Sequence, residues 1–568
     1  MAEAGAPWNG VGQSAPARVP EGALVGAGAW TMLVLGVLFI ILPVGALVQH
    51  SLFDGAGQWV GLDNFARYLE TPALADSAWR SVRLAALSAL ICVSLAYGFA
   101  YALTQTAMPG KAVFRAVALL PLLAPSLLMA ISLIYLFGNQ GLLRSWFPDG
   151  SIYGEPGIVM GSVLWTFPHA LMVLLTSMAT MDGRLPEAAR TLGASAWRVF
   201  WTVTVPASRY GLCMALVVVF VLVITDFGVA KVIGGSANVL ATDLYRQVVG
   251  QQNFSMGAVV GVWLLLPAVG SFFLERSIRR RQAAALGARS AVLQPVRSPL
   301  RDSVMWLFCA TVALAFLTVI GVAVFASLAT YWPYNLSPGL KNYDFDNMDG
   351  GGWGTYANSI RMALMTALLG TVLAFLTAWL VDKPRRFGPV REALNLVLSL
   401  PLAVPGLALG LGYILFFNAP GNPLGGLYGT MAILVLCTVV HFFSVAHLTM
   451  LAALRQLDQE FELVAESLGV PFWKTMWRVH LPVCLPALLQ VAGFFFINAM
   501  TTVSAVVFLY SPHTQLAAVA VLNMDDAGDV APAAAMAVLI FLTSAAVRAL
   551  FALVSHWTLA RTQLWRLK

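Results

Sequence analysis

Residues 186–206 read PEAARTLGASAWRVFWTVTVP and separate two long apolar runs, near 157–180 and near 208–229. Proline at the start, glutamate in the first turn and glycine near the end of PEAARTLG are typical of a short helix. A second short helix, from about Ser195, carries the aromatic residues of AWRVFW. Aromatic side chains on a polar loop leave apolar surface in water unless a partner covers them. The stretch therefore predicts a loop between two membrane spans that docks on another protein.

Apolar runs like the two that flank this loop recur along the whole chain. The 568 residues are 59% hydrophobic and only 10% charged, whereas soluble domains carry about 25% charged residues. Runs of roughly 20 apolar residues suit helices that cross a bilayer, and a helix satisfies its own backbone in lipid. A β-barrel would instead show short alternating segments. The sequence predicts an all-α membrane protein with about twelve spans, near 24–48, 79–104, 113–137, 157–180, 208–229, 256–275, 303–328, 358–381, 391–417, 428–453, 483–508 and 531–556.

The charged residues predict the orientation of these spans. The net charge is +7, and its basic residues cluster just after apolar runs, which is the pattern of cytoplasmic loops. Both termini and the central linker are therefore expected in the cytoplasm of a bacterium, with the chain in the inner membrane. No basic and aromatic interleaving of the kind used by nucleic-acid sites is present, so nucleic acid is not an expected partner. The basic clusters are Arg276 with Arg279–Arg281, Lys383 with Arg385 and Arg386, and Arg561 with Arg566 and Lys568.

Residues that would indicate an enzyme or a metal centre are sparse. The five cysteines lie in or beside apolar runs and indicate small buried side chains rather than disulfides or metal ligands. His169, His441 and His447 are either packed in the interior or weak metal ligands. The nearest resemblance to a phosphate-binding loop, Gly110-Lys111, lacks the required upstream glycine. The sequence predicts a chain without catalytic residues, a bound metal or a bound cofactor.

The two halves of the chain repeat each other. Leu120-Pro121 with Pro125 recurs as Leu400-Pro401 with Pro405. Gly193 and Pro206 recur as Gly469 and Pro482 at an offset of 276 (482 − 206), which runs without a gap through Leu240-Ala241 and Leu516-Ala517. A parallel repeat predicts a pseudo-two-fold axis along the membrane normal, with a pathway between the halves. The predicted organisation is a cytoplasmic tail (1–23), a first six-helix domain (24–275), a basic linker (276–302) and a second six-helix domain (303–568).

The spacing Glu-Ala-Ala, three residues, Gly, then Pro thirteen residues on resembles the coupling loop of type I (MetI-like) ABC importer permeases. In that family the loop docks in a groove on a cytoplasmic ATPase, and the resemblance spans essentially the whole chain. It implies a first coupling site formed by Glu187, Ala188, Ala189, Gly193, Trp197 and Pro206. The alternative is that both loops are only solvated connectors.

The second loop departs from the family pattern, because Leu463 stands where Glu187 stands in the first half. Ala465, Gly469 and Pro482 match the pattern, and Trp473 aligns with Trp197. Glu462 or Glu466 are the candidates to replace the missing glutamate. The resemblance implies a second coupling site formed by Glu462, Ala465, Glu466, Gly469, Trp473 and Pro482.

The same resemblance implies the partners of the chain. They are two ATP-binding-cassette ATPase subunits, which would hold ATP and Mg, and a periplasmic solute-binding protein, which would set most of the selectivity. The alternative from another class is a secondary transporter or channel driven by an ion gradient. It predicts carboxylates inside the membrane, for which Asp226 is the one candidate against two coupling loops.

Polar residues near the ends of the fifth spans, and in the segments after them, are the candidates for the substrate pathway. They are Thr225, Asp226, Asp243, Arg246, Thr501, Thr502, Ser504, Asn523 and Asp525. Asp226 either serves transport or lies at the wet interface.

Two stretches further resemble fused permeases assigned to 2-aminoethylphosphonate uptake, 226–254 and 510–529. The resemblance predicts that cargo, with Asp226 on its ammonium group and Lys231 or Arg246 on its phosphonate. Because the fused layout also resembles ferric-iron permeases, the alternative cargo is ferric iron or a small anion.

Overall fold

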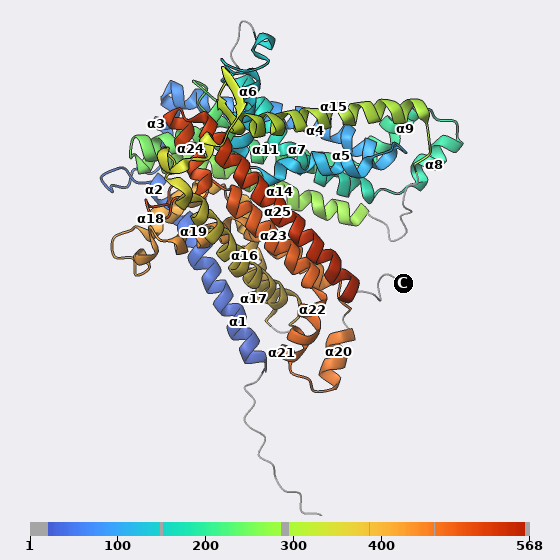
Figure 1. Ribbon diagram of the computed structural model, residues 1–568. Helices are drawn as coiled ribbons and strands as arrows, with labels where there is room; N and C mark the ends of the chain where they lie inside the picture. Colours follow the sequence, from blue (N-terminus) through green and yellow to red (C-terminus); the bar gives the residue numbers. More distant parts are fainter. Residues whose placement is uncertain (1–20, 148–151, 286–294, 385–386, 459, 563–568) are drawn as a thin grey trace, which may run out of the picture.

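The computed structural model describes residues 21–147, 152–285, 295–384, 387–458 and 460–562. Within these ranges the protein is helical except for loops and one two-stranded antiparallel sheet, β1 (Ala329–Tyr331) and β2 (Asn335–Pro338) (Figure 1). The predicted all-α membrane fold is confirmed. Most of the predicted N-terminal tail, the middle of the basic linker, and Arg385, Arg386, Arg566 and Lys568 lie outside the described residues.

The helices follow the repeat, and their bounds are as follows. The first half contains α1 (Glu21–Gly36), η1 (Val37–Ile41), α2 (Leu42–Ser51), α3 (Asp63–Glu70), α4 (Pro72–Gln105), α5 (Lys111–Ala118), η2 (Leu120–Leu123), α6 (Ser126–Phe137), η3 (Arg144–Trp146), α7 (Glu155–Ala179), α8 (Arg184–Thr191), α9 (Ala196–Val199), η4 (Phe200–Thr204), α10 (Val205–Ala207), α11 (Arg209–Thr225), α12 (Gly228–Ile233), α13 (Leu240–Tyr245), η5 (Arg246–Gly250) and α14 (Phe254–Ala285). The second half contains α15 (Pro299–Leu328), η6 (Lys341–Tyr343), η7 (Phe345–Asn347), α16 (Gly352–Asp382), α17 (Gly388–Ser399), η8 (Leu400–Ala403), α18 (Gly406–Phe417), η9 (Gly425–Leu427), α19 (Met431–Arg455), α20 (Glu460–Ser467), α21 (Phe472–Thr475), η10 (Met476–His480), α22 (Leu481–Val483), α23 (Leu485–Thr501), α24 (Ala517–Ala527) and α25 (Val530–Thr562).

Eight described helices are long and apolar enough to cross a membrane, and four bent helix pairs raise the number of candidate spans to twelve. The runs near 113–137 and 391–417, each predicted as one helix, are bent by 104° and 113°. Both breaks fall at the repeated proline motif, because proline lacks an N–H and pushes the preceding residue out of the helical region. Ala124 and Val404, directly before Pro125 and Pro405, accordingly have extended backbone, with ψ of 144° and 112°.

Helices extend into both ends of the region predicted as the basic linker (276–302). Helix α14 continues through Ala285, ten residues beyond the predicted end at 275, and α15 begins at Pro299 rather than near 303. Arginine, glutamine and alanine dominate the extra turns of α14, and these residues have high helix propensity. Positive charge near a helix C-terminus is also favourable to the helix dipole.

The repeat extends to backbone hydrogen bonds but contains a one-residue shift. The N–H of Lys231 donates to Phe227 O and that of Val507 to Val503 O, both at 2.9 Å, which preserves the offset of 276. The next helices, however, begin at Leu240 and Ala517, 277 residues apart (517 − 240). The predicted ungapped pairing of Leu240-Ala241 with Leu516-Ala517 is therefore wrong by one residue. The chain absorbs the extra residue in the irregular segment before α24.

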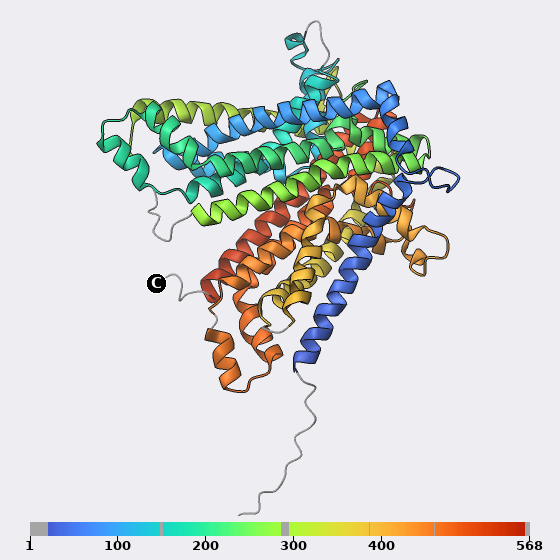
Figure 2. The ribbon, with the colours of Figure 1, turned by 180° about the vertical axis from the view of Figure 1, so that it is seen from behind.

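Each half of the protein packs against the first span of the other half. Helices α1 and α2 lie against α16, α17 and α18, and α15 lies along α5 and α6 as well as α25 (Figures 1 and 2). Each half thus exchanges its first span with the other half. The close approach of α18 to α2 in this exchange depends on Gly412, where an added Cβ would lie 2.5 Å from Pro43 O. Nearby, the hydroxyl of Tyr413 donates to Phe39 O at 2.9 Å. The exchange joins the two bundles at one end of the molecule.

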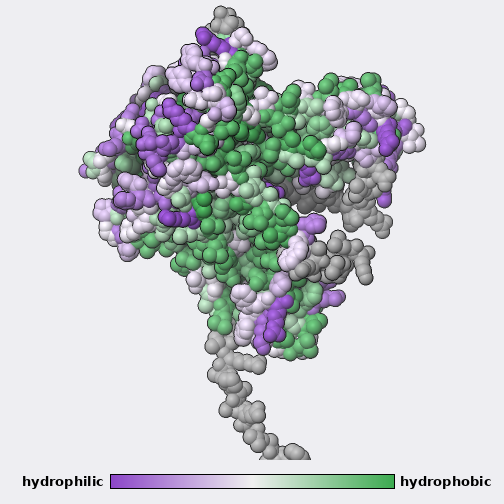
Figure 3. Space-filling model, viewed as in Figure 1, coloured by the Kyte–Doolittle hydropathy of each residue, from purple (hydrophilic) through white to green (hydrophobic). Residues whose placement is uncertain are grey.

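The two bundles meet at the end formed by α2, α18 and α24 and diverge toward α8 and α9 on one side and α20 and α21 on the other (Figures 1 and 2). Hydrophobic side chains dominate the flanks of both bundles (Figure 3), as expected where lipid replaces water. A cavity of about 630 Å³ lies between Glu275 of α14 and the residues Leu402, Thr449 and Gln490 of the second half.

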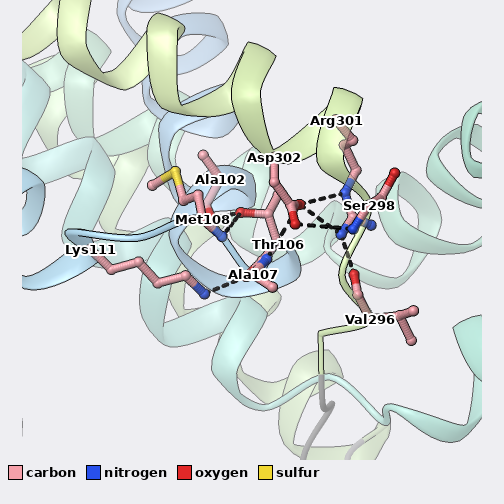
Figure 4. A network of polar contacts seen from close by, with 9 residues as sticks. All are labelled: Ala102, Thr106, Ala107, Met108, Lys111, Val296, Ser298, Arg301 and Asp302. Carbon is pink, nitrogen blue, oxygen red and sulfur yellow. Dashed lines mark hydrogen bonds and ion pairs between the residues drawn. The ribbon is translucent and has the colours of Figure 1, made fainter.

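The start of α15, the first span of the second half, is held to the first half by a network of hydrogen bonds (Figure 4). The Asp302 carboxylate accepts hydrogen bonds from Ser298 N at 3.1 Å, from Arg301 Nη2 at 3.0 Å and from Ala107 N at 3.4 Å. Ala107 follows α4, and Lys111 donates to the neighbouring Thr106 O. Asp302 therefore ties the exchanged helix to the first bundle.

We expect Asp302→Ala to lower the free energy of unfolding by about 1–3 kcal/mol in total, because the substitution leaves partly buried donors without their acceptor. The carboxylate is well buried, with 13% of the side chain exposed. Thermal unfolding of the detergent-solubilised protein measures the change. Asp76→Ala, on the exposed face of α4, is the matched control, and equal melting of the two variants would contradict this role for Asp302.

Candidate functional site

The predicted first coupling loop (186–206) consists of α8 followed by α9 and a π-helical turn. Gly193 ends α8 with φ of +80°, a left-handed conformation that glycine adopts at little cost. Gly193 N donates to Arg190 O at 2.9 Å and Ala194 N to Ala189 O at 3.0 Å, the hydrogen-bond pattern of a Schellman C-cap. Ser195 Oγ then accepts from Arg198 N and caps α9.

The second loop is built in the same way from α20 and α21. Gly469 has φ of +61°, and its N–H donates to Glu466 O at 3.1 Å. Val470 N donates to Ala465 O at 2.9 Å. The alanine and glycine of the motif therefore share one local purpose in both loops, which is to end the first helix and turn the chain into the second.

Both loops present apolar side chains to solvent. The two residues directly before the glycines, Leu192 and Leu468, are 88% and 73% exposed. Trp197 and Trp473, singled out from the sequence, are 71% and 43% exposed. Sequence reasoning did not single out these two leucines, although their equivalent places in the repeat were a signal. The other large exposed apolar residues of the loops are Leu185, Trp201, Phe461, Leu463, Val464, Val470 and Trp477.

The remaining motif residues lie beside this apolar surface. Glu187 and Ala188 are exposed on α8, with Ala189 half-buried behind them. Pro206 and Pro482 occupy the first turn of the equivalent short helices α10 and α22. The motif residues of each loop are thus gathered on one segment at the far end of its bundle (Figure 1).

Aromatic packing anchors the first loop to the second span of its half. The ring of Phe200 lies edge-on to Tyr97 and Tyr101 of α4, with centroids 6.0 and 5.2 Å away. The hydroxyl groups of Tyr97 and Ser208 are 2.8 Å apart. Phe200 and Ser208 therefore join the loop to α4 by direct contacts.

Charge anchors the second loop at the corresponding place. Glu462 Oε1 lies 2.9 Å from Lys383 Nζ and 3.2 Å from His480 Nε2. Trp379 Nε1 donates to His480 Nδ1 at 3.0 Å, and Phe472 stacks on Trp379. Of the two candidates for the missing glutamate, Glu462 therefore contacts its own chain, whereas Glu466 is exposed.

The residues at the ends of the fifth spans are engaged in local structure. Asp226 Oδ2 accepts from Val229 N at 2.8 Å, so this carboxylate caps α12. The hydroxyl groups of Thr225 and Thr501 donate hydrogen bonds to the carbonyl oxygens of Val221 and Ile497, one turn earlier in their own helices. Thr502 is buried, and Ser504 lies against Gly406 at the start of α18.

The remaining pathway candidates are divided between two places. Asp243 is 3% exposed inside the first half, where burial raises its pKa. Arg246 Nη2 donates to Asn238 Oδ1 at 2.7 Å within the same half. Asn523 and Asp525 lie on α24, where the halves meet, and burial together with neighbouring Asp526 raises the pKa of Asp525 to about 7. The structure does not gather the predicted pathway residues into one site.

The histidines have no arrangement that indicates a metal centre. Both ring nitrogens of His447 have partners, Thr377 Oγ1 at 3.0 Å and Asn395 Oδ1 at 3.2 Å. Across the described ranges, no group of three or more His, Cys, Asp or Glu side chains is placed to hold a metal ion.

A tandem pair of six-helix halves with up to twelve spans, capped by matching loops, defines a multi-pass transport permease. The family model described as binding-protein-dependent transport system inner membrane component matches residues 93–283 and 371–558. The chain belongs to this family, as an inner-membrane permease of an ABC importer and not an enzyme. Family membership implies an ATPase and a periplasmic binding protein as partners.

Several curated relatives share both halves. The ferric transport system permease protein FbpB of Actinobacillus pleuropneumoniae is 26% identical over 516 residues, covering 88% of this chain and 74% of that protein. A putative ferric transport system permease FbpB 1 of Haemophilus influenzae is 26% identical, covering 85% and 78%. The probable ABC transporter permease y4fN of Sinorhizobium fredii is 22% identical, covering 94% and 96%.

We expect Leu192→Asp and Leu468→Asp each to weaken binding of the ATPase at least about tenfold, because burying a leucine contributes about 1.5–3 kcal/mol and an unpaired buried charge costs more. Co-purification of the ATPase with membrane-inserted variants at matched expression measures the loss. Leu340→Asp is the control, since Leu340 is 72% exposed but lies in the loop after β2, away from both coupling loops. ATPase binding at wild-type strength by both loop variants would contradict the docking assignment.

Proposed function

We propose that this chain is the permease of a ferric-ion importer, working with two ATPase subunits and a periplasmic binding protein. The observation that supports the cargo is the similarity, along both halves, to two proteins named as ferric transport permeases. The sulfate and molybdenum permeases among the relatives match only 27–45% of this chain. A fused two-half permease for iron therefore fits the whole chain better than a single-half oxyanion permease.

The energy for transport comes from ATP and Mg held by the partner ATPases. Two loops of equal construction, each at the far end of its own bundle, support one ATPase subunit per loop. When both subunits are docked, closure of the ATPase pair moves the two loops together. The contacts of Phe200 with α4 and of Glu462 with α16 then carry this movement to the spans. The halves then close at the ATPase side and separate at the opposite side.

The residues assigned to an aminophosphonate from the sequence already have partners within the chain. Asp226 caps α12, Lys231 Nζ lies 2.9 Å from Asp526 Oδ1, and Arg246 contacts Asn238. A zwitterionic cargo would have to displace each of these contacts. Asp226, the one candidate relay of the ion-gradient alternative, likewise accepts a hydrogen bond within the chain. These contacts, with the relatives, favour ferric ion over 2-aminoethylphosphonate.

We expect proteoliposomes that contain this chain, the ATPase and the binding protein encoded beside it to accumulate ⁵⁵Fe supplied as ferric ion on that binding protein. Uptake should require ATP inside the proteoliposomes, where the ATPase subunits lie. The binding protein alone should co-elute with ferric ion in size-exclusion chromatography. Parallel assays use labelled 2-aminoethylphosphonate, phosphate, sulfate and molybdate. Accumulation of aminophosphonate without iron would overturn the proposed cargo, whereas uptake that is independent of ATP would overturn the energy source.

A further inference from the structure

An ion pair joins the two halves at the end where the bundles meet. Lys231 Nζ of α12 lies 2.9 Å from Asp526 Oδ1 of α24, with 25% and 45% of the two side chains exposed. Helix α12 belongs to the first half and α24 to the second. We propose that this pair is the latch that keeps the outer ends of the halves together until the loaded binding protein docks. The proposal rests on the ATP-driven importer function proposed above.

Packing places the ammonium group of Lys231 at a fixed point. It lies 5.6 Å from the centroid of the Tyr245 ring, a distance at which a cation is attracted to an aromatic face. Tyr245 in turn packs on Phe227 of its own half, at 4.9 Å, and stacks on Phe508 of the second half, at 6.1 Å. Lys231 and Tyr245 therefore approach the second half together.

Two adjacent carboxylates of the second half, Asp525 and Asp526, lie near Lys231. Asp526 is paired with Lys231, and Asp525 is the more buried of the two. Tyr135 and Tyr153 of the first half lie close enough to Asp525 for its charge to act on their hydroxyl groups. Separation of the halves would leave these carboxylates without their counter-ion, so the charges oppose opening.

The latch has no twin on the other side of the pseudo-two-fold axis. Val507 holds the position of Lys231, as the matching hydrogen bonds to Phe227 O and Val503 O show. At the offset of 277 that relates α13 to α24, Val249 holds the position of Asp526 (526 − 277). An interaction needed only for packing would be expected on both sides of a repeat. A charged pair on one side and two valines on the other instead make this ion pair a one-sided, breakable contact between the halves.

The strength of the pair suits a reversible lock. Both side chains are partly exposed, and water screens an ion pair of this kind. The pair is thus strong enough to bias the outer end toward closure, yet weak enough for a docking protein to break. In this structure the coupling-loop ends of the bundles are apart, and the latch favours closure of the opposite end.

The test measures ATP hydrolysis by the reconstituted importer with and without its binding protein. We expect Lys231→Met and Asp526→Asn each to raise hydrolysis in the absence of the binding protein about two- to fivefold, the range that loss of a partly exposed ion pair allows. Stimulation by the binding protein falls correspondingly. The reversed pair, Lys231→Asp with Asp526→Lys, should restore low hydrolysis, which a purely steric effect would not do.

Arg144→Met is the matched control, because Arg144 is an exposed cation on η3 of the first half, and hydrolysis by this variant should stay at the wild-type level. Wild-type hydrolysis in both single variants, or failure of the reversed pair to restore it, would overturn the latch. If the wild-type complex itself shows no stimulation by the binding protein, the importer function fails and the latch fails with it.

Discussion

The exchange of first spans between the halves is the constraint on which the rest of the structure depends. A helix in lipid satisfies its backbone internally, so only side-chain packing decides which helices associate. Here α1 and α2 complete the second bundle and α15 lies against the first. The exchange ties the bundles together at one end and leaves the opposite ends free to diverge. The two halves can then rock against each other while each exchanged span stays packed on its bundle.

In the proposed function, the coupling loops convert this freedom into a response to ATP. Each loop carries exposed leucine and tryptophan at its tip and an anchor at its base, so a partner that grips the tip moves the span beneath it. The anchors differ, since aromatic rings hold the first loop and the cluster of Lys383, Glu462 and His480 holds the second. Leu463 takes the place of Glu187, and Leu463 and Val464 are both exposed. The second docking surface is accordingly the more apolar of the two.

Much of this architecture was predictable because lipid leaves a strong signature in sequence. The apolar runs, the repeat and the Gly193 and Gly469 turns all follow from local chemistry. The 104° and 113° bends were missed because the runs stay apolar through the break, although the repeated prolines mark it. The exchange of spans was missed as well, since one apolar helix face resembles another.

The pathway residues illustrate a different limit of sequence reasoning. Asp226 and Asp243 stand out by type, but the contacts that occupy them, a helix cap and a buried position inside one half, come from tertiary structure. The pairing of Asp526 with Lys231 was not predictable, because the two residues are 295 apart in the chain (526 − 231). Leu192 and Leu468 are ordinary residues whose exposure alone marks them.

The central claim is that the halves rock so that the two loops approach each other when the ATPases bind ATP. The most direct measurement is the distance between spin labels at Arg198→Cys and Lys474→Cys, equivalent exposed positions of the two loops, with the exposed Cys213 replaced by serine. In the reconstituted complex the distance should shorten when a non-hydrolysable ATP analogue is added and lengthen again after its removal. An unchanged distance in complexes that demonstrably bind the nucleotide would contradict the claim.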